Sequence, residues 1–278
     1  MRLCFLSVVL AVAPLMAGPA TLRVCADPNN LPYSNEKAAG FENRIAELLA
    51  NSMNQMVEFV WWSERKGLVN NTLNAGRCDV LMGLPVGMDD AELTRPYFRS
   101  TYVFVTRKDR NLNIESLTDD RLEKLRIGIH VVGDDYAPPS FALARRGIVA
   151  NVTGYSLFGE YGEPNPPAKL IHAVAAADVD VAIVWGPFAG YFAPREKVAL
   201  EVTPVSPQAY MAVPFVYDIA MAVRKGNDKL RAALDDALVR NCAEVQGVLH
   251  EFGVPQVAQA EGKGTCDESR GSPAASSR

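Results

Sequence analysis

The sequence is poor in residues that build metal centres and activated nucleophiles. Its three histidines, His130, His172 and His250, are far apart and form neither an H-x-x-x-H nor an H-x-x-H pair. This spacing argues against a zinc site. No G-x-S-x-G elbow, P-loop or dinucleotide-binding glycine motif occurs either, and these motifs mark many hydrolases, NTPases and NAD enzymes. We therefore expect a protein that is not an enzyme.

Clusters of basic residues are also missing. The 28 Lys and Arg residues are outnumbered by 32 Asp and Glu residues, and the net charge is −4. Nucleic acids and anionic membrane surfaces attract proteins through concentrated positive charge. We expect neither of them as a partner.

Only one apolar run suggests a targeting segment. Residues 1–20, MRLCFLSVVLAVAPLMAGPA, contain one Arg, an apolar stretch and small residues, which is the pattern of a secretory signal peptide. The stretch is too short for a membrane anchor, and cleavage after Ala17 or Ala20 fits the small residues there. We therefore expect an exported mature protein that does not insert into a membrane.

Cysteines are few, and export makes them candidates for disulfides. Cys4 lies in the leader, and the other four, Cys25, Cys78, Cys242 and Cys266, allow three pairings. We favour Cys242–Cys266, which would join the C-terminal tail to the last helix. Cys25 and Cys78 lie at neighbouring predicted strands, where a disulfide and two buried thiols are equally consistent with the sequence.

A strand, a polar loop and a helix open the mature chain. Residues 22–26, LRVCA, are typical of a short buried strand, and residues 27–35, DPNNLPYSN, of a polar loop. Residues 40–54, GFENRIAELLANSMN, place their apolar side chains on one helical face. Ligands of open α/β sheets bind in loops that follow the carboxyl ends of strands. The loop is therefore a candidate binding surface.

A β-α-β-α-β pattern occurs twice, with DVLMG at residues 79–83 and DVAIVWG at residues 180–186 in matching places. A further strand, residues 216–226, and a following helix return the chain to its first half. This order predicts an α/β protein of two lobes, joined by two crossover strands around a central cleft. We assign residues 1–20 to the signal peptide, 21–104 and 207–256 to lobe I, 105–206 to lobe II, and 257–278 to a flexible tail.

These segments resemble the periplasmic solute-binding proteins of the polar amino-acid receptor type, over roughly residues 21–256. A narrower resemblance, to the MoxJ/XoxJ branch associated with quinoprotein methanol dehydrogenases, rests on four segments. They are CADPNNLPYSN (25–35), GFENRIAELLA (40–50), GRCDV (76–80) and YFRSTYVFVTRKD (97–109). The resemblance implies a type II, Venus-flytrap fold and a role in methanol oxidation in the periplasm.

The chain departs from the receptors where they grip an amino acid. Such receptors hold the α-carboxylate with an Arg after the third strand and the α-ammonium with an acid after a lobe II strand. Here the loop after the third strand, residues 83–94, has no Arg or Lys. At the end of the lobe II strand, where the receptors have the acid, this chain has Trp185 followed by Gly186 and Pro187. Asp134 and Asp135 stand at the lobe II helix entry, where they would repel a carboxylate. An Arg outside the loop, such as Arg95 or Arg99, is a weak substitute.

The residues that stand at the cleft positions of these receptors are mostly acidic and aromatic in this chain. Such a cleft suits a protein segment or an apolar or cationic small molecule, although the aromatic run at residues 185–193 equally suits a helix packed on its own sheet. Strand alternation allows only one of Trp61 and Trp62 to face the cleft. The candidate cleft residues are Asp27, Asn30, Tyr33, Trp62, Leu84, Asp134, Asp135, Trp185 and Phe188.

The resemblance and the missing receptor groups favour a non-catalytic accessory protein for a PQQ-dependent methanol dehydrogenase, acting in assembly, stabilisation or activation. The expected partner is the large subunit of that enzyme, with its cytochrome c as a second candidate. We expect a monomer with no cofactor of its own, because PQQ and Ca²⁺ or a lanthanide would belong to the partner. The alternative is an ABC-transporter binding protein for a small solute other than a standard amino acid. Delivery of a metal by the acidic loops is a minor hypothesis.

Overall fold

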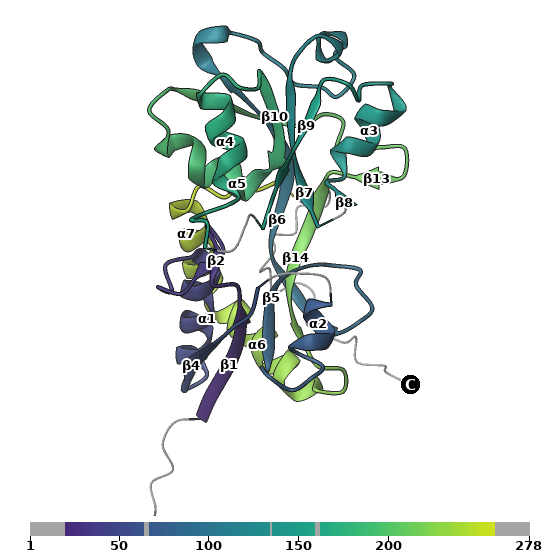
Figure 1. Cartoon of the computed structure of the whole chain (residues 1–278). Coiled ribbons are helices and arrows are strands. Elements are labelled where there is room, and N and C mark those ends of the chain that lie inside the picture. The colour runs from purple at the N-terminus through teal and green to yellow at the C-terminus, as the bar shows by residue number, and fades with distance from the viewer. Residues whose placement is uncertain (1–19, 64–66, 134, 159–161, 259–278) are drawn as a thin grey trace, which may run out of the picture.

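The fold was analysed in a computed structural model, which describes residues 20–63, 67–133, 135–158 and 162–258. The predicted signal peptide up to residue 19, Asp134 and Cys266 lie outside these residues. The described chain forms two lobes, and two strands, β6 (Glu92–Arg107) and β14 (Val216–Val223), run between them (Figure 1). The predicted two-lobe α/β architecture with two crossover strands is confirmed. Within the described residues, no helix is long and apolar enough to cross a bilayer.

The lower lobe of Figure 1 is built on a sheet of strand order β4-β1-β5-β14-β6. β1 pairs in parallel with β4 and β5, whereas β14 is antiparallel to both β5 and β6. Helices α1 and α6 lie on one side of the sheet and α2 on the other (Figure 1). The elements are β1 (Ala20–Ala26), α1 (Phe41–Ser52), β4 (Gln55–Trp61), α2 (Leu68–Asn71), β5 (Val80–Pro85), α6 (Asp228–Arg240) and α7 (Cys242–Glu251).

The upper lobe repeats this arrangement. Its strands follow the order β9-β7-β10-β6, and β11 adds to the other side of β6. The elements are β7 (Ile127–Val132), β8 (Asp135–Tyr136), α3 (Pro139–Arg145), β9 (Val152–Ser156), α4 (Ala168–Ala175), β10 (Val181–Trp185), α5 (Gly186–Phe192) and β11 (Leu200–Pro204). Two short hairpins complete the strands, β2 (Asn29–Asn30) with β3 (Ser34–Asn35) and β12 (Ala209–Tyr210) with β13 (Val213–Pro214).

Matching ion pairs mark the repeated cycle. Arg23 in β1 binds Asp79 through its backbone N–H and its guanidinium, with Nη2 2.7 Å from Oδ1. Arg126, just before β7, binds Asp180 in the same way, at 2.8 Å. Each Asp directly precedes the third strand of its lobe. The hydrogen bonds from Arg126 outweigh partial burial and lower the pKa of Asp180 to about 2. Each pair therefore fixes the first strand of a lobe to its third.

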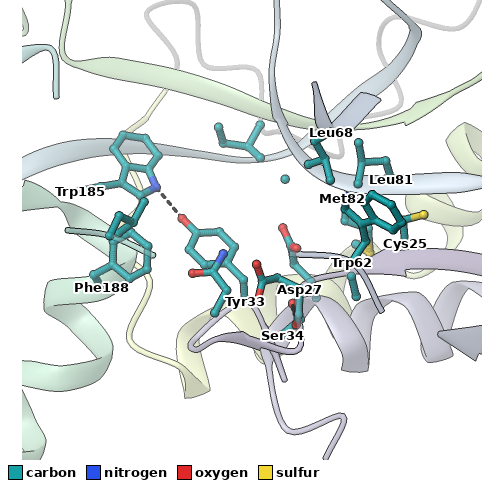
Figure 2. Close-up of a pocket in the computed structure, with 16 residues that line it drawn as sticks. Cys25, Asp27, Tyr33, Ser34, Trp62, Leu68, Leu81, Met82, Trp185 and Phe188 are labelled. Carbon is teal, nitrogen blue, oxygen red and sulfur yellow. Dashed lines mark hydrogen bonds between the residues drawn. The ribbon is translucent and has the colours of Figure 1, made fainter. Parts of the chain in front are cut away.

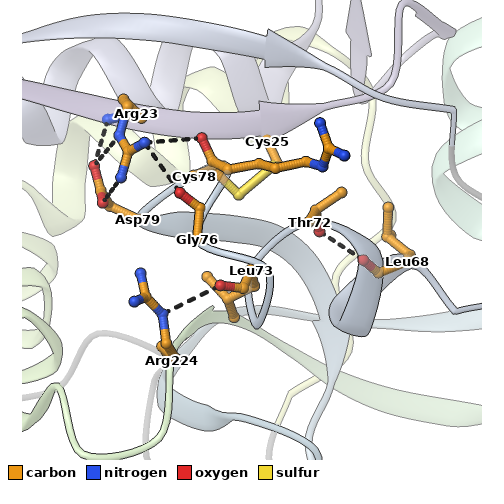
Figure 3. Close-up of a disulfide and its surroundings, with 10 residues drawn as sticks. Arg23, Cys25, Leu68, Thr72, Leu73, Gly76, Cys78, Asp79 and Arg224 are labelled. Carbon is orange, nitrogen blue, oxygen red and sulfur yellow. Dashed lines mark hydrogen bonds and ion pairs between the residues drawn. A yellow bond between two sulfur atoms is a disulfide. The ribbon is translucent and has the colours of Figure 1, made fainter.

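The disulfide Cys25–Cys78 lies beside the lower of these ion pairs (Figure 3). Of the two possibilities that the sequence left open for these cysteines, the disulfide is confirmed. It joins β1 to the turn before β5, and the Arg23 guanidinium also donates to the carbonyl oxygens of Gly76 and Arg77. The segment between α2 and β5 is thus attached to β1 at several points. The predicted Cys242–Cys266 pairing stays a prediction, since Cys266 is not described.

The apolar faces that the sequence predicted are buried. Phe41, Ile45 and Leu49 of α1 are fully buried, and the Phe41 ring packs edge-on against Phe98 of β6 at 5.8 Å. The prediction of a single helix after residues 216–226 is wrong, because this part of the chain forms two helices, α6 and α7. They are separated at Asn241, whose side chain donates to the last-turn carbonyl of Ala237 and ends α6.

Candidate functional site

The loop between β1 and α1 forms one wall of the gap between the lobes. Asp27 Oδ1 accepts the backbone N–H of Asn29 at 2.7 Å, and the Ser34 hydroxyl donates to the Asp27 carbonyl at 2.8 Å. At its other end, the Tyr33 carbonyl accepts the N–H of Glu42 in the first turn of α1. These bonds provide partners for backbone groups that would otherwise have none at the start of a helix and in a polar loop. The loop therefore holds Tyr33 in a fixed position.

Tyr33 contacts the other lobe directly. Trp185, the last residue of β10, donates its indole N–H to the Tyr33 hydroxyl at 2.5 Å. The ring of Phe188, in α5, lies edge-on to Tyr33 at a centroid distance of 5.4 Å. Further out, Asn29 donates to the Glu163 carbonyl at 2.6 Å. The two lobes are thus bridged by the side chains of the chain itself.

A cavity of about 180 Å³ lies beside this bridge, between the lobes (Figure 2). Its lining combines aromatic rings from both lobes with the carboxylates of Asp27 and Glu42. The Trp62 ring closes it on the side of the disulfide, and the Arg77 guanidinium lies 4.9 Å from the centre of that ring. The lining residues from the lower lobe include Cys25, Asp27, Asn30, Tyr33, Ser34, Glu42, Trp62, Leu68, Leu81, Met82 and Ile219, and those from the upper lobe Leu157, Trp185 and Phe188.

A second cavity, of about 610 Å³, adjoins the first and is mostly apolar. Leu84, Met88, Tyr102, Trp185 and Tyr217 are among its walls. It also contains the buried His130, whose Nε2 lies 3.2 Å from the Pro167 carbonyl. Burial lowers the pKa of His130 to about 4, so the ring is neutral at physiological pH.

No positively charged side chain is found among the described residues that line these two cavities and a third one, of about 400 Å³, beside Asn29. The acids Asp27, Glu36, Glu42, Asp90 and Glu163 do line them. A carboxylate ligand needs a desolvated cation or several aimed N–H groups. Among the described lining residues, the charged side chains are carboxylates.

The structure brings together most of the cleft residues that the sequence predicted. Asp27, Asn30, Tyr33, Trp62, Trp185 and Phe188 all line the 180 Å³ cavity, and Leu84 lines the larger one next to it. Asp134 lies outside the described residues, and of Asp135 only the backbone, in β8, is described. Whether these residues bind a ligand or partner stays a prediction.

Neighbouring aromatic residues have other roles. Trp61 stacks on Phe59 at 5.3 Å and lines none of the three cavities, as strand alternation requires once Trp62 faces the cleft. Tyr191 stacks on Phe252 at 5.7 Å. Within the aromatic run at residues 185–193, Trp185 and Phe188 line the cleft, and Tyr191 packs α5 against the end of α7.

Sequence reasoning missed Glu42, a carboxylate that is only 8% exposed. It lies in the first turn of α1, and its Oε1 accepts the Tyr97 hydroxyl at 2.5 Å. That hydroxyl in turn accepts the N–H of Gly83 at 3.1 Å. Burial, and then the Glu42 charge, raise the pKa of Tyr97 well above its ordinary value. The only sign of Glu42 in the sequence is that it is an acid in the first turn of a predicted helix. Acids are common there because they interact favourably with the helix dipole, so this pattern does not mark a site.

The two arginines beyond the first loop do not replace the missing receptor group. Arg99 pairs with Asp218 at 2.7 Å, and the backbone N–H of Arg95 binds Asp235 in α6. Neither side chain lines the cavities described above. The weak substitution that Arg95 offered on sequence grounds therefore has no support in the structure.

Comparison with known proteins places these features in a family. The family model of the bacterial extracellular solute-binding proteins, family 3, matches residues 22–244. MoxJ of Methylorubrum extorquens is 32% identical over 247 residues, which cover 84% of this chain and 81% of that protein. Two crystal structures are also similar. The periplasmic binding protein XoxJ from Methylobacterium extorquens AM1 has 33% identity and a TM-score of 0.71, over 86% of this chain and 100% of that one. MxaJ from Methylophaga aminisulfidivorans MPT has 25% identity and a TM-score of 0.73, over 85% and 100%.

Proposed function

The chain belongs to the bacterial extracellular solute-binding proteins of family 3 and is a homologue of MoxJ, and from this premise we propose that it is a periplasmic, non-catalytic accessory protein. Its partner in this proposal is the large subunit of a PQQ-dependent methanol dehydrogenase. The protein assists that enzyme in assembly, stabilisation or activation. PQQ and the Ca²⁺ or lanthanide ion belong to the enzyme.

The observation that carries the proposal is the state of the cleft. Tyr33, Trp185 and Phe188 occupy the space between the lobes and bind one another. The described lining has carboxylates and no Lys or Arg. A receptor for amino acids needs the opposite arrangement, because it must compensate a desolvated α-carboxylate. This lining, together with the likeness to MoxJ, favours a role toward another protein.

The mouth of the cleft offers a surface for such a partner. Val86, which follows β5, is 51% exposed, and Val132, at the end of β7 in the other lobe, is 40% exposed. Val132 also lines the larger, apolar cavity. Exposed apolar groups around a concave apolar region are typical of a protein interaction site. We assign the enzyme-binding surface to this mouth.

A small-solute receptor of an ABC transporter is the second candidate. The cavities of about 180 and 610 Å³ favour it, since both lie between the lobes. A receptor is stabilised by its own ligand, by about 4 kcal/mol when the free ligand exceeds Kd a thousandfold. A screen of small solutes by thermal denaturation separates the two functions.

Reconstitution of the enzyme tests the accessory role. Metal-free and PQQ-free large subunit is incubated with PQQ and Ca²⁺ or a lanthanide, and methanol oxidation is followed with and without this protein. We expect more active enzyme, or faster activation, when the protein is present. Val132→Asp should remove the effect, and Val149→Asp, which changes an equally apolar exposed residue of the same lobe (61% exposed), should not. Equal recovery of activity without the protein would contradict the proposal.

A further inference from the structure

The hairpin of β12 and β13 presents an apolar tip to solvent at the side of the upper lobe (Figure 1). Met211, at this tip, is 71% exposed, the largest exposed fraction among the large apolar side chains of the described residues. The stretch around it, PVSPQAYMAVPFVY (204–217), has no charged residue, although Asp, Glu, Lys and Arg make up 22% of the chain. We propose that this hairpin is a docking element for a partner protein, and that Met211 inserts into an apolar pocket on the surface of that protein.

Two features of Met211 are unfavourable for the protein on its own. Its backbone lies in the left-handed region, with a φ of 53°, which Gly and Asn adopt with less strain than Met. Met211 and Ala212 form the loop between the paired residues Tyr210 and Val213, and such hairpin loops favour Gly, Asn or Asp where φ is positive. The side chain is also left in water, so folding gains little from its apolar surface. Strain and exposure at one position indicate a role outside the fold, and burial in a partner would recover the apolar surface.

The base of the hairpin is attached to the upper lobe. Tyr210 and Val213 pack against the buried apolar cluster that contains Phe104 and Phe215. The backbone N–H of Phe215 donates to the Gln208 carbonyl at 2.8 Å. Because these contacts hold the base, the tip is presented in one position. A partner that binds it does not have to order the hairpin, which lowers the free-energy cost of association.

The composition of the tip favours a protein as the partner. Met is enriched in protein interfaces, where its unbranched side chain adapts to irregular pockets, and charged residues are depleted at interface cores. An apolar loop that enters a membrane surface is usually accompanied by basic residues, and residues 204–217 contain neither Lys nor Arg. We therefore expect an uncharged, apolar pocket on the partner that accepts one Met side chain.

The hairpin lies apart from the cavities between the lobes but is connected to their wall. Residues 206–214 line none of the three cavities described above. Tyr217, which lines the larger cavity, donates its hydroxyl to the Pro214 carbonyl at 3.0 Å. A protein that covers the mouth of the cleft at Val132 therefore has the hairpin within reach on the same lobe. We assign the pocket to the large subunit of methanol dehydrogenase, and this identity rests on the proposed function.

Titration calorimetry of that subunit with wild type and two variants tests the inference. Met211→Asp places a charge at the tip and should weaken binding at least about tenfold. Met56→Asp changes another exposed methionine (59% exposed), in β4 of the other lobe, and should leave the affinity unchanged. Wild-type affinity in Met211→Asp would overturn the inference and leave the accessory role standing. Absence of binding by the wild type would overturn both.

Met211→Asn separates docking from a structural role. Asn tolerates the left-handed backbone better than Met, so this variant should unfold at a temperature no lower than that of the wild type. Its affinity for the enzyme should still fall at least about tenfold, and full affinity would overturn the inference. Dimerisation of the wild type in sedimentation, abolished by Met211→Asp, would also overturn it, because a second copy would then cover the tip. Binding of the wild type to phosphatidylcholine vesicles, abolished by the same substitution, would overturn it in favour of a membrane contact.

Discussion

The indole N–H of Trp185 lies 2.5 Å from the hydroxyl of Tyr33 and joins the two lobes across the cleft. Both side chains are part of larger aromatic contacts, since Tyr33 also packs against Phe41 at 4.8 Å and Trp185 against Tyr102 at 5.3 Å. The bond therefore links the inner core of one lobe to that of the other. This contact between side chains of the two lobes helps to hold the lobes together.

A double-mutant cycle measures the strength of this contact. Trp185→Phe removes the donor, Tyr33→Phe removes the acceptor, and the cycle cancels the other contacts of each residue. We expect a coupling free energy of about 0.5–1.5 kcal/mol, as for a partly buried neutral hydrogen bond. Urea denaturation of the four proteins gives the value. If the effects of the two substitutions on the free energy of unfolding are additive, the hydrogen bond contributes nothing to holding the two lobes together.

Removal of the Cys25–Cys78 disulfide should destabilise the protein strongly. The two residues are 53 positions apart, and a cross-link that closes a loop of this size contributes about 2–4 kcal/mol. The double variant Cys25→Ala/Cys78→Ala is compared with wild type by urea denaturation under oxidising conditions.

Reducing agent is the control for this prediction, because it should lower the midpoint of the wild type by more than that of the double variant, which keeps Cys242 and Cys266. A double variant within about 0.5 kcal/mol of wild type, the scatter expected for an ordinary surface substitution, would contradict the structural role assigned to this disulfide.

The Arg126–Asp180 pair predicts a defined dependence of stability on pH. The folded protein lowers the pKa of Asp180 from 3.8 to about 2. A lowered pKa means that the contribution to stability is complete above pH 3.8 and is lost as the pH falls toward 2. The Arg126 side chain is 54% exposed, so solvent screening reduces the contribution to about 1 kcal/mol.

Asp180→Asn should therefore be less stable than wild type at pH 7, and the difference should disappear toward pH 2. The measurement is the free energy of unfolding as a function of pH. Asp89→Asn, at an exposed site in the other lobe, should match wild type throughout. A constant difference across the pH range would show that the charge of Asp180 is not the cause.

Two glycines should respond to alanine in opposite directions. A Cβ at Gly40 would lie 1.9 Å from the Tyr33 carbonyl oxygen, so Gly40→Ala must displace the loop that carries Tyr33. A Cβ at Gly247, within α7, would meet no atom within 4 Å, and Gly247→Ala should stabilise the protein by about 0.5–1 kcal/mol. We expect Gly40→Ala to lose about 2 kcal/mol, because the added Cβ overlaps the Tyr33 carbonyl and the loop must repack around it.

Thermal denaturation of both variants checks this prediction. Double mutants that combine Gly40→Ala with Trp185→Phe give a second readout, because the Tyr33–Trp185 coupling should be lost once the loop has moved. A neutral Gly40→Ala would mean that the loop adapts, and that Tyr33 is not held as the hydrogen bonds around it indicate.

Much of the fold follows from sequence patterns, because buried parallel strands and amphipathic helices have clear periodicities. The two β-α-β-α-β cycles were readable for this reason, down to the matching Asp79 and Asp180. The residues at which individual strands begin and end could not be predicted from the sequence. β6 begins at Glu92, five residues before the YFRSTYVFVTRKD segment (97–109), and continues past Pro96. A register shift opposite Ala220 accommodates that proline, and nothing in the sequence indicates which strand will carry the shift.

The site was readable only where it depends on loops at strand ends. The loop that carries Asp27 and Tyr33 follows a strand, so the general position of ligand sites in α/β sheets predicted it, whereas the resemblance to the receptors pointed to Trp185. Glu42 was missed because it sits on a helix, and its role depends on Tyr97, 55 positions away in the sequence. Contacts of that kind arise from tertiary packing, and periodicity carries no information about them.

Titration calorimetry of the purified protein against the methanol dehydrogenase large subunit tests the central proposal most directly. The enzyme is used in two forms, with and without its metal and PQQ. The accessory role predicts binding at micromolar Kd or tighter, about −8 kcal/mol, with a preference for the empty enzyme if the role is assembly or activation. Heat at the level of dilution for both forms of the enzyme would contradict the role.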